Sequence, residues 1–98
     1  MKYPKLPTTV ETPGGRITVQ TVEPFEVEGQ KCWGTWDQTT RTIRVDKTMP
    51  QSFQWNVYFH ELAHVAIMDS GIDNLFSLEV HEALCDALAT ARYREKFG

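Results

Sequence analysis

The sequence predicts an α+β domain in which a small antiparallel or mixed β-sheet of three to four strands, from the N-terminal half, packs against two long C-terminal helices. Three observations support this fold class. Residues 1–47 contain four of the five prolines and alternate apolar with polar residues, which is the period of a half-buried strand. Residues 48–98 show helical spacing instead. The 98 residues suffice for a single domain and are too few for two.

The first half predicts four strand segments. Alternating residues indicate strands over 16–22 and 25–27, and two further strands are expected over 31–36 and 41–46. A short polar turn separates the last two, which therefore predict a hairpin. We expect residues 1–12 to be flexible.

The second half predicts two helices. Thr48 and Gln51 have the spacing of a capping box, and the helix that they open should run to about Asp69, with Gly71 as its terminator. Ser77 is a favourable N-cap for a second helix that runs close to the C-terminus.

Several apolar side chains of this half are expected to be buried. On the first helix the expected buried residues are Tyr58, Phe59, Val65 and Met68. On the second helix the apolar positions compatible with packing against the first helix or the sheet are Leu78, Leu84, Leu88 and Ala91. We also expect the three tryptophans to lie in the core, with a substrate groove as the alternative: Trp33, Trp36 and Trp55.

Composition narrows the classes of function. The net charge is −3 and the basic residues form no cluster, so we expect no nucleic-acid partner. No apolar run is long enough to span a bilayer and no secretory signal is recognisable, so we expect no membrane association and a cytoplasmic location. Cys32 and Cys85 are interpreted as two buried free thiols, and a disulfide between them is the less favoured alternative.

The motif that carries chemistry is His60-Glu61-Leu62-Ala63-His64, in the middle of the first predicted helix. Histidines at i and i+4 project from one face of a helix about one turn apart, so both imidazoles can ligate one divalent cation such as Zn²⁺. Glu61 lies beside the first histidine and can accept a proton from a nearby water without ligating the metal.

A catalytic zinc site takes three protein ligands, and the third is expected from the acids of the second helix. Glu79, Glu82 and Asp86 share one face of that helix. We choose Glu82 as the metal ligand, with Glu79 as its rival. We assign Asp86, one turn further on, as the carboxylate that accepts the free imidazole N–H of a ligand histidine.

Hydrolysis also needs a donor for the developing oxyanion, and spacing does not specify it. The candidates are His81, Tyr58 and Tyr93, of which we rank His81 first as a second catalytic residue beside Glu61. The competing interpretation of His81 is an exposed side chain without a role.

The HExxH of residues 60–64, followed by the ExxxD of residues 82–86, resembles the signature of gluzincin metallopeptidases. The chain length is similar to that of the minigluzincins, and the strand segment over 41–46 is similar to that of small IrrE/ImmA-like and phage-encoded metallopeptidases. The chain departs from the thermolysin pattern at His81, where those enzymes have Asn.

This resemblance implies a minimal zincin-like fold and the same assignment of site residues. His60, His64 and Glu82 are the implied zinc ligands, Glu61 the general base and acid, and Asp86 the residue that orients His60. The strand over residues 41–46 is the implied edge along which an extended peptide substrate lies.

The resulting hypothesis is a zinc-dependent endopeptidase, formed by residues 1–98 as a single metallopeptidase-like domain, that acts on a protein or peptide. One alternative is a non-catalytic protein-binding module that zinc stabilises. The other is a metal-free adaptor with an accidental motif. The sequence indicates neither the residues that contact substrate nor the oligomeric state.

Overall fold

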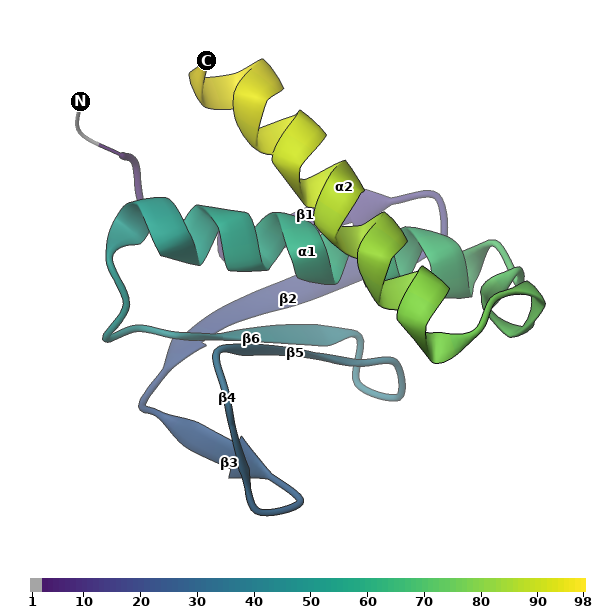
Figure 1. The fold of residues 1–98 in the computed structure, drawn as a ribbon. Coiled ribbons are helices and arrows are strands. Elements are labelled where there is room, and N and C mark those ends of the chain that lie inside the picture. Colours follow the sequence, from purple (N-terminus) through teal and green to yellow (C-terminus); the bar gives the residue numbers. More distant parts are fainter. Residues whose placement is uncertain (1–2) are drawn as a thin grey trace.

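The computed structural model describes residues 3–98 and contains two small sheets and two long helices. Figure 1 shows the chain passing through the strands first and the helices last. The elements, in chain order, are β1 (Thr9–Thr12), β2 (Gly15–Val22), β3 (Phe25–Val27), β4 (Gln30–Cys32), β5 (Gly34–Asp37), β6 (Thr42–Asp46), α1 (Gln51–Asp69), the short 3₁₀ helix η1 (Asp73–Leu75) and α2 (Leu78–Phe97). The predicted α+β class is confirmed.

The main sheet has the strand order β1-β2-β6-β5, and β3 and β4 form a separate antiparallel pair. The β2 and β6 strands run parallel, whereas the β1–β2 and β5–β6 pairs are antiparallel, so the sheet is mixed. The predicted hairpin is confirmed as β5 and β6. The β6 strand is paired on both sides, and β5 forms the edge of the sheet.

The single strand predicted over 31–36 is wrong, because the chain leaves one sheet at Cys32 and enters the other at Gly34. Gly34 lies so close to α1 that a Cβ atom there would overlap the side chain of Val57. This close approach favours glycine at the start of β5. Trp33, between the two strands, is half exposed rather than buried.

Helix α1 lies between the main sheet and α2 (Figure 1) and forms most of the core. The parallel register places Val19 beside Ile43, and these side chains pack against α1 with Ile17 and Val45. On the helix, Tyr58, Phe59 and Val65 are buried as predicted, and Met68 is half-buried; Trp55 is buried and Trp36 packs against the core.

The two helices begin differently. Helix α1 has Pro50 at its N-cap and no side-chain cap, so the predicted capping box is wrong. The Thr48 hydroxyl and backbone N–H both donate to Asp46 Oδ1 instead, at 2.6 and 2.8 Å. Helix α2 begins as predicted, because Ser77 Oγ accepts a hydrogen bond from the backbone N–H of Val80.

Residues 3–12, part of the segment expected to be flexible, contact the rest of the domain at several points. Strand β1 pairs with β2, the Trp55 indole N–H donates to the carbonyl of Pro4 at 2.8 Å, and the Tyr93 hydroxyl donates to that of Tyr3 at 2.6 Å. Residues 1 and 2 lie outside the described residues. The flexibility of residues 3–12 stays a prediction.

The side of α2 that faces α1 also differs from the prediction. Its least exposed residues follow a strict four-residue spacing: His81, Cys85, Ala89, Tyr93 and Phe97. The apolar residues predicted to be buried on this helix, Leu78, Leu84, Leu88 and Ala91, are all exposed. Small and polar residues therefore form the contact in the first half of α2 and the aromatic residues Tyr93 and Phe97 form it near the end, whereas Leu84, Leu88 and Ala91 lie outside this stripe.

Both cysteines are free; Cys85 is buried as expected, whereas Cys32 is only half-buried. Within residues 3–98, neither helix combines the length and the apolar character that crossing a bilayer requires.

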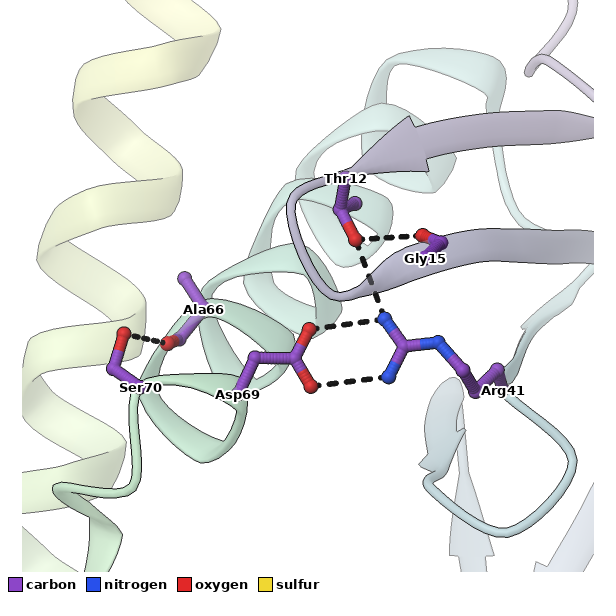
Figure 2. A network of polar contacts seen from close by, with 6 residues as sticks. All are labelled: Thr12, Gly15, Arg41, Ala66, Asp69 and Ser70. Carbon is purple, nitrogen blue, oxygen red and sulfur yellow. Dashed lines mark hydrogen bonds and ion pairs between the residues drawn. The ribbon is translucent and has the colours of Figure 1, made fainter.

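A polar network joins the end of α1 to the two hairpin turns of the main sheet (Figure 2). Arg41 donates to both carboxylate oxygens of Asp69, at 3.0 and 2.9 Å, and to the hydroxyl of Thr12 at 3.2 Å. The two charged side chains are only 24% and 19% exposed, so the pair is shielded from solvent. The hydrogen bond from Arg41 lowers the pKa of Asp69.

Asp69→Asn should lower the free energy of unfolding by about 1 kcal/mol at pH 7, because it removes one charge from a two-point ion pair that is partly screened by solvent. A carboxylate with a lowered pKa stabilises the fold above its unfolded pKa, so the contribution should disappear as the pH falls below about 4. Urea unfolding of both proteins at each pH measures this difference. Asp73→Asn, at an exposed acid of η1, is the matched control. An equal effect of both substitutions at pH 7 would contradict the assignment.

Candidate metal centre

The two histidines of the motif lie on one face of α1 and meet Glu82 from the first half of α2. The Nε2 atoms of His60 and His64 are 3.1 Å apart. The Glu82 carboxylate lies 3.0 Å from His60 Nε2 through one oxygen and 3.5 Å from His64 Nε2 through the other. Three potential ligand atoms from two helices thus converge on one point.

Each histidine has a second partner on α2 at its other ring nitrogen. Asp86 Oδ1 lies 2.8 Å from Nδ1 of His60. His81 Nε2 lies 3.0 Å from Nδ1 of His64. An ionised carboxylate only accepts hydrogen bonds, so we assign the His60 Nδ1 proton as donated to Asp86, which leaves a lone pair on Nε2 of the neutral ring. His64 has the same arrangement when it donates to His81.

In this tautomeric state the centre contains three acceptors and no proton. Two imidazole lone pairs and a carboxylate within 3.5 Å of one another repel unless a positive charge lies between them. That charge comes either from protonation of a histidine or from a bound cation. Partial burial disfavours protonation of His64, whose pKa is lowered mainly for that reason and also by the neighbouring His60 and His81.

The spacing of the three groups also fits a metal ion. Zinc binds imidazole nitrogen and carboxylate oxygen at about 2.0–2.2 Å, and tetrahedral geometry then separates neighbouring ligand atoms by about 3.3–3.5 Å. The observed separations of 3.0–3.5 Å are close to these values. His60, His64 and Glu82 are therefore the residues best placed to hold a metal ion.

A second grouping of potential ligands contains His60, His64 and Cys85, whose ligand atoms all lie within 4.8 Å of one another. The Cys85 thiol is fully buried, and burial raises its pKa to about 12. Thiolate formation is correspondingly unfavourable in the metal-free protein. Because the Glu82 carboxylate is exposed enough to ionise and lies 3.0 and 3.5 Å from the two Nε2 atoms, we regard Cys85 as the weaker candidate for the third ligand.

Glu61 lies beside this centre, on the side of α1 that β5 covers. It is only 8% exposed, and the first residue of β5, Gly34, approaches its side chain closely. Burial raises the pKa of Glu61 to about 7; the nearby His60 opposes this shift and Glu82 adds to it. A carboxyl group with a pKa near neutrality can both accept and return a proton at physiological pH.

A cleft of about 350 Å³ opens beside the centre, between β5 and the first half of α1. His60, Glu61 and Asp86 form its polar end, and Trp33, Phe53 and Asn56 form part of its other walls. The rings of Trp33 and Phe53 meet edge to face at 5.5 Å. The sequence pattern did not single out Phe53 and Asn56, and it favoured the core for Trp33. Asn56 and Phe53 lie one and two turns before His60 on α1, and this spacing could have indicated that they share a face with His60.

The remaining predicted residues lie elsewhere. Glu79 is exposed and makes no contact with the histidines among the described residues. Tyr58 is buried against Trp55, and the Tyr93 hydroxyl is bonded to Tyr3, so neither faces the centre. His81 contacts His64, and its predicted action on a substrate oxygen stays a prediction without a supporting contact.

The substrate edge implied for residues 41–46 is wrong. Strand β6 is bonded to β2 on one side and to β5 on the other, so it has no free backbone groups for a peptide. The edge next to the cleft is β5.

No family model, curated protein or solved structure matches the chain. The geometry of the site is therefore the basis for its interpretation.

The environment of Glu61 makes a prediction for the metal-free protein. Between pH 4.5, the ordinary pKa of this carboxyl group, and about pH 7, Glu61 is protonated in the folded chain and ionised in the unfolded chain. The buried carboxyl should therefore destabilise the fold as the pH rises through that range. Glu61→Gln removes this penalty. Its free energy of unfolding relative to wild type should increase by about 2 kcal/mol between pH 5 and pH 8.

Chemical denaturation of both chelator-treated proteins at the two pH values measures this change. A difference between the two proteins that is independent of pH would contradict the burial of an ionisable Glu61.

Proposed function

We propose that this chain is a zinc-dependent metallopeptidase that hydrolyses an internal bond of a protein or peptide. The observation that carries the proposal is the convergence of His60, His64 and Glu82 within 3.0–3.5 Å, with Glu61 beside them. The gluzincin-like order of these residues in the sequence supports the same assignment. When bound, zinc supplies a water of lowered pKa and polarises the carbonyl of the substrate.

The protein groups around the centre divide the remaining work. Asp86 and His81 orient the two imidazoles through their Nδ1 atoms, which directs both Nε2 atoms at one point. Glu61 accepts the proton of the attacking water and passes it to the leaving amine, for which its raised pKa is suited.

The substrate is proposed to lie along β5. This strand is the edge of the main sheet beside the cleft, so an extended peptide can pair with its free backbone groups and pass the centre. Trp33 and Phe53 would then contact an apolar side chain of the substrate. The two free cysteines agree with a reducing compartment, and we place the protein in the cytoplasm.

Zinc binding should show a stoichiometry of one ion per chain by calorimetry of the chelator-treated protein. Glu82→Ala should weaken binding by at least about a hundredfold, because it removes a ligand. Glu79→Ala, one turn earlier on α2, is the matched control and should leave the affinity unchanged. Equal loss in the two variants would contradict the choice of ligand.

Peptidase activity on a mixed peptide library should fall by at least about a hundredfold in Glu61→Gln while the zinc content stays at one per chain. Undiminished cleavage by this variant would overturn the mechanism.

The alternative of a non-catalytic, zinc-stabilised binding module is favoured by one observation. Only Cys85 and Ala89 are fully buried on α2, so the polar groups of the centre and the aromatic residues Tyr93 and Phe97 form the rest of its contact with the domain. Under this alternative, chelation unfolds the chain and Glu61→Gln changes neither activity nor partner binding. The peptidase assay therefore separates the two functions.

A further inference from the structure

The cleft beside the candidate metal centre adjoins a second hollow of about 460 Å³. Phe53 and Asn56, on the first half of α1, line both spaces, so the two form one groove with α1 as its floor. The second hollow lies between the first turns of α1 and the last turns of α2, where Thr90 and Arg94 line it. Figure 1 shows the last turns of α2 diverging from the start of α1, in agreement with a space between them.

One side of α2 forms a wall of this groove. Asp86, Thr90 and Arg94 follow one another at four-residue spacing, so they lie on the same side of the helix. Asp86 lies at the metal centre, where it contacts His60. Arg94 is eight residues further on, about 12 Å along the helix axis at 1.5 Å per residue. The groove therefore has an acidic end at the centre and a basic end near the start of α1.

Arg94 is available to a ligand at that basic end. Among the described residues that line the second hollow, Arg94 has the one basic side chain, and no side chain is acidic. Arg94 is exposed and forms no ion pair within residues 3–98. The two neighbouring cations of α2 lie elsewhere, because Arg92 is 5.4 Å from the ring centroid of Phe59 and Lys96 is 5.2 Å from that of Trp55.

Strand β5 can pair with only one part of a substrate that passes the centre. Gly34 begins the strand beside Val57 and Glu61 of α1. From there β5 runs toward the end of α1, since Arg41 of the following turn binds Asp69. The groove extends the other way, toward the start of α1. A peptide that pairs with β5 and continues in an extended form therefore enters the groove, where side chains contact it instead of a strand edge.

We propose that Arg94 binds a carboxylate of the substrate and thereby determines which peptides are cleaved. This inference rests on the proposed function. An extended peptide advances about 3.3 Å per residue, so about three to five residues cover the roughly 12 Å between the centre and Arg94. A guanidinium matches a carboxylate through two parallel hydrogen bonds. At the other end of the groove, Glu61, Glu82 and Asp86 disfavour a second carboxylate, so the position of the recognised charge is fixed.

The recognised carboxylate belongs either to an acidic side chain or to the C-terminus of the peptide. Cleavage of a mixed peptide library by the zinc-loaded wild-type chain, followed by sequencing of the products, separates these two sources. Asp and Glu, or the free C-terminus, should be enriched at one fixed position about three to five residues from the cleaved bond.

A preferred peptide is then compared with its counterpart that has Gln or a C-terminal amide in place of the carboxylate. The wild-type chain should favour the carboxylate form by at least about tenfold in kcat/KM. The difference should lie in KM, because Arg94 is distant from the reacting atoms and contacts the substrate equally before and during the reaction.

Three variants test the role of Arg94 in this preference. Arg94→Gln should abolish it and leave kcat on the neutral peptide unchanged, and Arg94→Glu should favour peptides with Lys or Arg at the same position. Arg92→Gln, two residues earlier and on the side of α2 that faces Phe59, is the matched control and should retain the wild-type preference. Circular dichroism verifies that each variant folds.

The outcomes distinguish this inference from the proposed function. A wild-type chain that cleaves no peptide overturns both. Cleavage without a preference for a carboxylate overturns only the role of Arg94, as does a preference that survives Arg94→Gln or that Arg92→Gln removes to the same extent.

Discussion

The account rests on three electron-pair donors, His60 Nε2, His64 Nε2 and the Glu82 carboxylate, that meet within 3.5 Å. Asp86 and His81 hold the far side of each imidazole, so neither ring can turn its lone pair away without losing a hydrogen bond. A cluster of this kind requires a positive charge at its centre. A metal ion satisfies all three groups at once, whereas one proton satisfies only two.

The same requirement connects the site to the stability of the domain. Helix α2 contributes two fully buried side chains to the core and otherwise meets α1 through His81, Glu82, Asp86 and the aromatic residues near its end. The centre therefore both joins the helices and forms one end of the cleft. On the opposite side of α1, β5 buries Glu61 and thereby changes its proton affinity. Core packing and site chemistry share the same contacts in this small domain.

Local patterns predicted the α+β class, the hairpin of β5 and β6, the end of α1 near Asp69 and the start of α2 after Ser77. Helical spacing put Glu79 and Glu82 on one face and did not separate them; the ExxxD pattern of residues 82–86 favoured Glu82, which lies 3.0 Å from His60 in the structure, whereas Glu79 is exposed. The predictions that were wrong concern features that depend on contacts between distant parts of the chain. Leu84 and Leu88 are as apolar as core residues, and only the packing of α2 on α1 reveals that they face outward. The pairing of β6 on both sides depends on a crossover that no local pattern specifies.

X-ray absorption spectroscopy of the zinc-loaded protein tests the central claim most directly, since it reports the atoms bound to the metal. The account predicts a first shell of nitrogen and oxygen at about 2.0–2.2 Å that includes two imidazoles and no sulfur. In Glu82→Ala, either the first shell should lose an oxygen or the protein should lose the metal. A sulfur at about 2.3 Å would instead identify Cys85 as a ligand, and a chain that retains no zinc would remove the centre from the account.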